Sequence, residues 1–435
     1  LQALRSQPVP TMAVDESVSW RIPPMWWLYG LVFFSQFKPS EPFLVGFLMH
    51  VKGFSNVDVY QEMFPLWTYA RFPLLFLTGI CSELDVVAGQ GVLLVGALCG
   101  FATVLLTWCG TTLLPQQLAQ ITVAANFASR FAVNAVIFQL ASPDRVQQDV
   151  HIMKAILLLS NAGSAILGEV LRDKLGTSLS KLFWISAIAT GLALICSIFL
   201  MGSKPSVRDS SPMIEKAKAS CSDLIKVFQL PCVAWWTIWA LTVNPAHGVA
   251  LTYWQNLLID RITHVKDHNG YMLGASYLAA ALVVAACRRS AILRSWTSVL
   301  VILSILSMGV LLLALTITHN EVIFYAFFIG IQCVYEVSTS VSTFQVGCEV
   351  CKSVENGGPK EARLALLFCI TGVMSGAVGA LVQHVNPISR RFMMVAVAML
   401  LLALLLSAFT LMRQLYRSFR NRRRGDPFLM TDLMP

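Results

Sequence analysis

A polar stripe runs along one apolar segment in the first half of the chain. Asn126, Arg130 and Asn134 recur at every fourth position, which places them on one face of a helix. A cation inside an apolar segment of membrane length costs roughly 3 kcal/mol or more unless it faces a cavity or a partner. Arg130 is therefore expected to line a pathway for an anionic solute. The alternative is a salt bridge that only holds two halves of the protein together.

A matching stripe lies in the second half of the chain. Its members share one helical face by their spacing, and they are Gln332, Tyr335, Glu336, Thr339 and Thr343. If both stripes face one site, Glu336 is a candidate counter-ion of Arg130 when that site is empty. An anion would then displace this carboxylate, or a proton would neutralise it, because burial favours the uncharged form of a carboxyl group.

Two motifs near the N-terminus combine charged and aromatic residues. In the motif 38–43, Glu41 lies between two prolines, which break a helix and expose backbone groups to a cavity. In the motif 62–69, Phe64 and Trp67 lie close to a carboxylate and would form a slot for a flat aromatic heterocycle. The alternative for these aromatic residues is a belt at the membrane interface.

The elements that must position these residues are membrane spans. Hydrophobic residues make up 56% of the chain and charged residues 13%, whereas soluble proteins usually carry about 25% charge. The apolar residues fall in runs close to the roughly 20 residues that cross a bilayer. The sequence therefore predicts an all-α membrane protein with twelve transmembrane helices. We place these spans near 23–49, 61–83, 87–111, 117–141, 147–170, 180–201, 231–257, 269–287, 294–317, 320–349, 361–385 and 390–413.

A polar segment divides the spans into six and six. This layout is typical of the major facilitator fold, in which two six-helix bundles surround a midplane site. In that fold the first, fourth, seventh and tenth spans line the central cavity, so both polar stripes would face it. The predicted units are an N-terminal tail (1–22), a first bundle (23–201), a linker (202–230), a second bundle (231–413) and a basic tail (414–435).

Loop charges predict the orientation. The side with both termini and the linker carries 20 basic residues against 8 on the other, which by the positive-inside rule places it in the cytoplasm. The basic tail indicates an anchor beside anionic lipid rather than a nucleic-acid patch. Cys348 and Cys351 have no second pair or nearby histidine, so no metal or other cofactor is expected.

Several motifs, in their order and spacing, resemble those of one family, the reduced folate carriers and thiamine transporters. The first two are specific, KPSEPFL (38–44) and EMFPLWTY (62–69). The others are SRFAVNAVIFQLASP (129–143), the turn His268-Asn269-Gly270, STFQVG (342–347) and ALLF (365–368). The resemblance runs from about residue 20 to residue 390.

This resemblance implies roles for single residues. Glu41 falls on the glutamate with which the family holds the heterocycle. Phe64 and Trp67 fall on the aromatic pair typical of the thiamine carriers. Arg130 falls on the fourth-span arginine of the folate carriers, which faces the glutamate tail of folate, and Tyr335 matches a tyrosine of both branches.

The departures from the family pattern affect the substrate. Gln332 replaces a basic residue of span ten, Gly379 stands where the folate carriers have a lysine, and Leu273 stands where both branches have an acid. Glu83 falls on an acid at the end of span two and is expected to serve a gate between spans. Because a cation in a low-dielectric cavity outweighs a stacking residue, the balance favours an anion.

The sequence therefore predicts a secondary-active vitamin transporter, not an enzyme, in the plasma membrane. It would move folate or a related anionic pterin by alternating access, with a counter-anion or a proton as the coupling ion and the lipid bilayer as its surroundings. The alternative substrate is thiamine or its phosphate esters. A non-transporting membrane receptor is the alternative of a different class.

Overall fold

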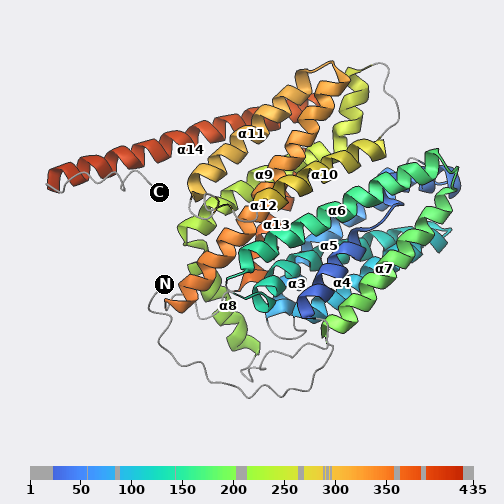
Figure 1. Cartoon of the computed structure of the whole chain (residues 1–435), viewed down its shortest axis with the longest axis horizontal. Helices are drawn as coiled ribbons and strands as arrows, with labels where there is room; N and C mark the ends of the chain where they lie inside the picture. The colour runs from blue at the N-terminus through green and yellow to red at the C-terminus, as the bar shows by residue number, and fades with distance from the viewer. Residues whose placement is uncertain are drawn as a thin grey trace.

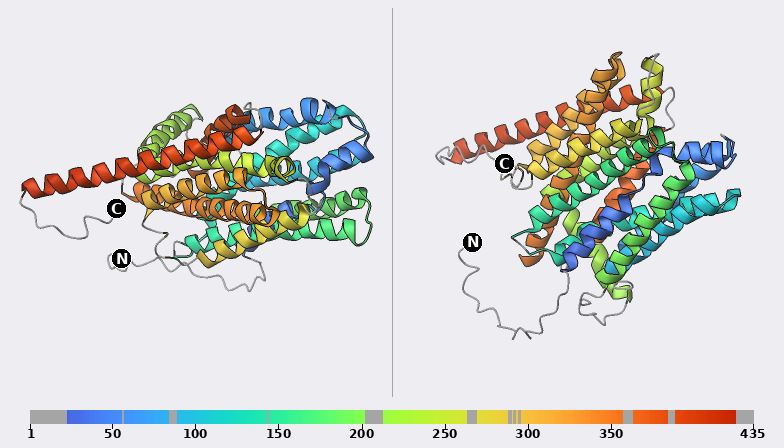
Figure 2. Two further views of the ribbon diagram at one scale, coloured as in Figure 1. Left: turned by 90° about the horizontal axis from the view of Figure 1, so that it is seen from above. Right: turned by 45° about the vertical axis from the view of Figure 1, so that its right-hand side comes forward.

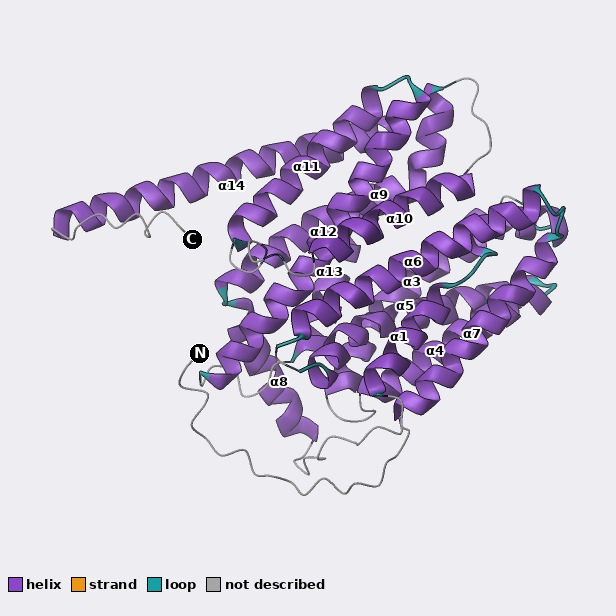
Figure 3. Cartoon of the chain, viewed as in Figure 1, coloured by secondary structure: helices purple, strands orange, loops and turns teal. Residues whose placement is uncertain are grey.

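Every regular element in the described part of the chain is a helix (Figure 3). The structure is a computed structural model that describes residues 23–55, 57–83, 89–142, 144–201, 213–262, 269–287, 290, 293, 296–356, 363–383 and 388–424. The predicted N-terminal tail, the first part of the linker, His268 and residues 425–435 lie outside the described residues. So does the side chain of Glu83, although its backbone ends a helix.

The first predicted span is broken. Its helix α1 (Pro24–Gln36) ends before Pro39, and the chain continues as the short turns η2 (Glu41–Phe43), α2 (Leu44–Gly46) and η3 (Phe47–Val51). Pro39 and Pro42 explain the break, because proline has no backbone N–H to donate and its ring disfavours helix in the residue before it. The prolines thus set Glu41 on a turn instead of a helix face.

Five long helices complete the N-terminal half. After the π-helical turn η4 (Asp58–Met63) they are α3 (Phe64–Glu83), α4 (Gly89–Cys109), α5 (Leu113–Leu140), α6 (Val146–Asp173) and α7 (Leu179–Met201). The helices of the C-terminal half are α9 (Pro231–Arg261), α10 (Asn269–Cys287), α11 (Thr297–Ile317), α12 (Glu321–Glu355), α13 (Leu364–Gln383) and α14 (Ile388–Arg424).

The predicted linker contains a helix of its own, α8 (Met213–Phe228). It meets α9 at a bend of 83°, where Pro231 begins the new helix. Asp223 on α8 lies 3.8 Å from Arg363 at the start of α13. The linker is therefore attached to the second half of the molecule at this end.

Nine helices within the described residues are long and apolar enough to cross a membrane, and α8 with α9 would count as a tenth if that bent pair is one span. The two remaining predicted spans are α1 with its broken continuation, and α3. The helix α1 has only 13 residues, and α3 carries Arg71 and an internal proline. The predicted twelve spans are consistent with this set of helices.

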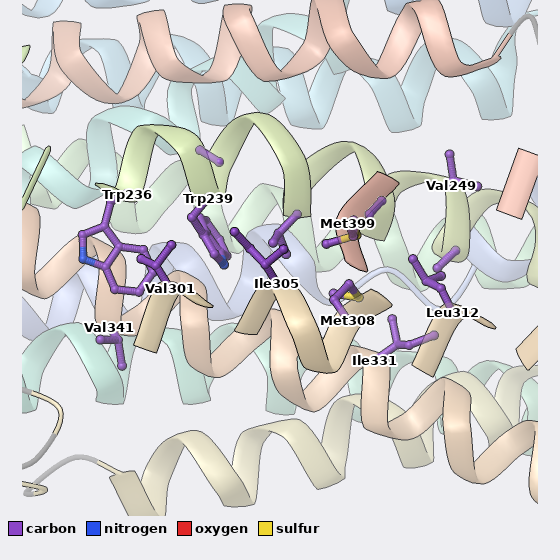
Figure 4. Close-up of a cluster of buried hydrophobic side chains, with 14 of the residues drawn as sticks. Trp236, Trp239, Val249, Val301, Ile305, Met308, Leu312, Ile331, Val341 and Met399 are labelled. Carbon is purple, nitrogen blue, oxygen red and sulfur yellow. The ribbon is translucent and has the colours of Figure 1, made fainter. Parts of the chain in front are cut away.

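The two halves lie side by side as two groups of helices, blue to green and yellow to red in Figure 1. They meet where α6 packs on α10 and where α3 packs on α13. Helix α14 extends well past the others (Figure 2). The largest apolar cluster fills the second group, with Trp236 and Trp239 packed beside Val301, Ile305 and Met308 (Figure 4).

Small residues allow α4 and α5 to approach closely. A Cβ atom added at Gly96 would overlap both Oγ and Cβ of Ser129. The carbonyl of Gly96 also accepts a hydrogen bond of 2.8 Å from Nδ2 of Asn126. Close approach through small residues is a common means of helix association in lipid, where apolar burial between helices contributes little.

We expect the Gly96→Ala substitution to destabilise the protein by about 1–3 kcal/mol, because the added methyl group overpacks the α4–α5 contact. Thermal unfolding of the purified protein in detergent measures this. Gly248→Ala is the matched control, since nothing lies within 4 Å of a Cβ at that position. The double variant Gly96→Ala with Ser129→Gly should recover most of the loss, and equal melting of Gly96→Ala and the wild type would contradict the packing argument.

Candidate functional site

Both polar stripes line one cavity between the two halves of the molecule. Its volume is about 390 Å³, within the range of small-molecule sites. Residues of α1, α4, α5, α6, α9, α10, α12 and α13 form its wall. The polar and charged residues on the wall include Asn126, Arg130, Asn134, Lys154, Asn161, Asn244, His247, Tyr277, Gln332, Tyr335, Glu336, Thr339 and Thr343.

Arg130 is held in place by its own helix. One of its terminal nitrogens donates a hydrogen bond of 3.0 Å to Oδ1 of Asn126, and Asn126 is in turn fixed by Gly96. The guanidinium carbon lies 5.8 Å from the ring centroid of Phe127. Within the described residues no carboxylate lies within 4 Å of this guanidinium. Arg130 thus presents a positive charge to the cavity.

Glu336 has a different counter-ion from the one predicted. Its Oε2 lies 2.5 Å from Nζ of Lys154 on α6, and its Oε1 accepts a hydrogen bond of 2.9 Å from Gln332. The hypothesis of an Arg130–Glu336 pair is therefore wrong for this state of the protein. The physical reason is that Lys154, two turns into α6, reaches the same carboxylate from a nearer helix.

A hydrogen-bonded chain continues from this ion pair into α9. Oε1 of Gln332 lies 2.8 Å from Nε2 of His247; an amide oxygen only accepts, so the imidazole donates. His247 also stacks on Tyr335, with ring centroids 3.6 Å apart and an angle of 2° between the planes. The family pattern has a basic residue at position 332. In this chain the amide of Gln332 links His247 to Glu336 instead.

A second polar contact ties α6 to α12 one turn away. Nδ1 of His151 lies 2.6 Å from Oγ of Ser340, and both side chains are buried. The sequence interpretation missed this contact and the role of Lys154. The signal was present, because Gln147, His151 and Lys154 are spaced by four and then three residues, which places them on one helical face.

The residues expected to hold the heterocycle lie off this cavity. The side chain of Glu41 is 63% exposed and forms an ion pair of 2.7 Å with Lys38. It interacts electrostatically with Arg130 at longer range. Phe64 packs beside the small cluster of Leu48, Val59 and Met63, in the half of the bundle away from the linker.

Trp67 lies one ring away from the cavity. Its indole meets Phe127 edge to face, with centroids 6.0 Å apart, and Phe127 lines the cavity wall. Asn134, Tyr335 and Gln332 lie on the wall as the sequence predicted. The structure therefore brings together five of the eight predicted binding residues and places Glu41, Phe64 and Trp67 outside their cavity.

Two positions that depart from the family pattern carry no charge near the site. Leu273 packs against the core of the second half. Gly379 faces Pro245 of α9, and a Cβ atom added at this glycine would lie 3.8 Å from Cβ of the proline. Neither replaces the missing lysine or acid, so the charge of the cavity depends on Arg130, Lys154 and Glu336.

The sequence of this chain is similar to those of known carrier proteins. The family model described as reduced folate carrier matches residues 19–208. The resemblance to the reduced folate carriers is confirmed. The match covers α1 to α7 and therefore both specific motifs, the broken first span and the Arg130 stripe.

Individual relatives extend the similarity over most of the chain. A folate-like transporter of Dictyostelium discoideum is 23% identical over 363 residues, which are 83% of this chain and 60% of that protein. The reduced folate transporter of Rattus norvegicus is 25% identical over 78% of this chain and 72% of its own length. Human thiamine transporter 2 is 27% identical over 202 residues, 45% of this chain and 40% of that protein.

Solved structures show the fold. The human organic anion transporter MFSD10 superposes with a TM-score of 0.64 at 14% identity, covering 88% of this chain and 97% of that one. The major facilitator superfamily transporter FucP, in its outward conformation, superposes with a TM-score of 0.62 at 14% identity, covering 88% and 98%. The chain therefore has the major facilitator fold. Its match to the carrier family model and the nine apolar helices of membrane length among the described residues make it a multi-pass membrane protein.

The Lys154–Glu336 pair predicts a non-additive mutational pattern. Lys154→Gln or Glu336→Gln alone should destabilise the protein by about 3–5 kcal/mol, because each leaves one buried charge unpaired. The double variant should recover most of this loss, as thermal unfolding in detergent would show. Lys38→Gln with Glu41→Gln is the control, since a pair with one exposed partner contributes roughly 1 kcal/mol or less. Strictly additive effects at 154 and 336 would argue against the pair.

Proposed function

We propose that this protein is a secondary-active transporter that moves folate or a related anionic pterin across a membrane by alternating access. The observation that carries the proposal is the charge of the cavity. Lys154 neutralises Glu336, and Arg130 remains without a carboxylate within 4 Å among the described residues. A cavity with one uncompensated guanidinium favours an anionic solute.

The low dielectric of the cavity makes this single charge decisive. The interaction of two unit charges is several times stronger in a protein interior than in water, and a guanidinium binds a carboxylate with two parallel hydrogen bonds. Asn126 holds Arg130 in position, so little side-chain freedom is lost when an anion binds. In the proposed complex Arg130 and Asn134 bind the anionic end, with Gln332 beside them.

Aromatic side chains on the cavity wall suit the ring system of a pterin. Trp239 stacks on Tyr335 at 6.2 Å between centroids, and Tyr335 stacks on His247. Tyr335 and Glu336 close the site from the second bundle. Glu41, Phe64 and Trp67 remain proposed contacts of the ring, in the state that opens on the side away from the linker.

The proposed coupling step acts on the polar contacts between α6 and α12. An arriving anion competes with Glu336 for Lys154, or a proton neutralises Glu336, and either event weakens the contact between the two bundles. A ligand shifts such an equilibrium only by its different affinity for the two states. Breaking this ion pair provides that difference, because the pair exists only while the two helices are close.

Thiamine or a thiamine phosphate is the alternative substrate. It is favoured by Phe64 and Trp67 in the motif 62–69 and by the similarity to human thiamine transporter 2 over the N-terminal half. Arg130 argues against free thiamine, which is a cation. A phosphate ester of thiamine would carry its own negative charge to Arg130.

Uptake of radiolabelled folate and thiamine, compared in the same carrier-deficient cells, tests the proposal. We expect saturable folate uptake, reduced at least tenfold by Arg130→Glu because the anion would face a carboxylate. Arg145→Glu is the control, since Arg145 is exposed at the start of α6. Folate uptake that is unaffected by Arg130→Glu, or thiamine uptake in place of folate uptake, would contradict the assignment.

A further inference from the structure

A second arginine shares the aromatic ring that Arg130 contacts. Arg71 on α3 places its guanidinium carbon 4.2 Å from the centroid of Phe127 and 5.4 Å from that of Trp67. Arg130 approaches the same Phe127 ring at 5.8 Å. Two cations from two different helices therefore flank one phenylalanine of the cavity wall.

Neither cation has an ion-pair partner within the part of the chain that the structure describes, and Glu41 acts on Arg130 only at longer range. Among the described residues no carboxylate lies within 4 Å of Arg71. Its Nε is buried and has no hydrogen-bond acceptor there, as is the case for Nε of Arg130. The aromatic faces stabilise the charge, but a buried cation whose donors are left unsatisfied is costly unless an anion joins it during the working cycle.

Arg71 lies behind the Phe127 ring and is not itself part of the cavity wall. It interacts electrostatically with Tyr335 on the opposite wall, and the ring it stacks on lines the cavity. Because both guanidinium carbons lie near one centroid, they are at most 10 Å apart. A guanidinium carbon lies roughly 4 Å from the carbon of a carboxylate that it binds, and the two carboxylates of a glutamyl group are roughly 5 Å apart by bond lengths. The upper limit of 10 Å is shorter than the roughly 13 Å that two such contacts and the glutamyl group can bridge, so one solute with two negative groups can reach both arginines.

We propose that Arg71 forms a second anion subsite, so that this transporter recognises a dianionic solute through Arg71 and Arg130 together. The second carboxylate of a folate tail, or the diphosphate of a thiamine ester, would bind there, and rotation of the Phe127 ring opens Arg71 to the cavity. The inference rests on the proposed transport function but not on the identity of the ring. It accounts for the neutral residues Gln332 and Gly379, because the second positive charge comes from α3 instead of α12 or α13.

The test compares matched dianionic and less charged ligands on the purified full chain. One pair is folate and its γ-amide, in which one carboxylate is a neutral amide; the other is thiamine diphosphate and thiamine monophosphate, which has one phosphate group instead of two. Isothermal titration in detergent gives Kd for each. In whichever pair binds, we expect the wild type to bind the dianionic member at least tenfold more tightly than the less charged member. Arg71→Gln should reduce this preference to less than threefold while Kd for the less charged member stays nearly unchanged.

Two variants complete the experiment. Arg172→Gln is the matched control, because Arg172 also lies over an aromatic ring, that of Phe43 at 5.1 Å, but is exposed and far along α6 from the cavity wall. Arg71→Lys keeps the charge without the planar fork and serves if the glutamine variant does not fold. It should retain part of the preference.

The outcomes separate this inference from the proposed function. If thiamine diphosphate binds and folate does not, and Arg71→Gln removes that preference, the folate proposal fails and the subsite stands. Suppose that folate binds and that Arg71→Gln leaves the preference for two negative groups intact, or raises Kd for both members of the pair equally in a folded protein. In either case the subsite is overturned and the folate proposal stands. A wild type that shows no preference for the dianionic member of either pair also overturns the subsite.

Discussion

The ion pair between Lys154 and Glu336 is the interaction on which the cavity depends. Because it neutralises the carboxylate of the cavity wall, the positive charge of Arg130 remains available. In a low-dielectric site this charge balance decides which solutes are attracted. The proposed preference for anions thus depends on a contact between two helices, one from each half of the molecule.

In the transport cycle that we propose, the same pair connects recognition to movement. Lys154 and His151 lie on one face of α6, and their partners Glu336 and Ser340 lie on one face of α12. Rocking of two bundles in the major facilitator fold requires such contacts to separate. A buried pair is strongly favourable only while its geometry is good, so a small opening of the two helices removes most of its stabilisation.

Small residues let the two halves close around the aromatic side chains. On α12 and α13, Gly347 and Gly372 leave the space that Phe138 and Phe131 of α5 occupy. A side chain at either glycine would displace a ring and separate the bundles. The packing of rings on glycine backbone therefore complements the polar contacts, since the rings position α5, and with it Arg130, against the opposite wall.

The sequence by itself determined the fold class and the two polar stripes, because hydropathy and helical spacing are properties of one segment at a time. It identified Arg130 and Glu336 correctly as residues of one cavity. The tertiary structure alone decided that Glu336 pairs with Lys154, that Glu41 lies on an exposed turn with Lys38, and that Arg71 stacks on Phe127. The physical reason is that a helical period fixes which residues share a face, whereas the partner across the cavity depends on how far each neighbouring helix is rotated and shifted.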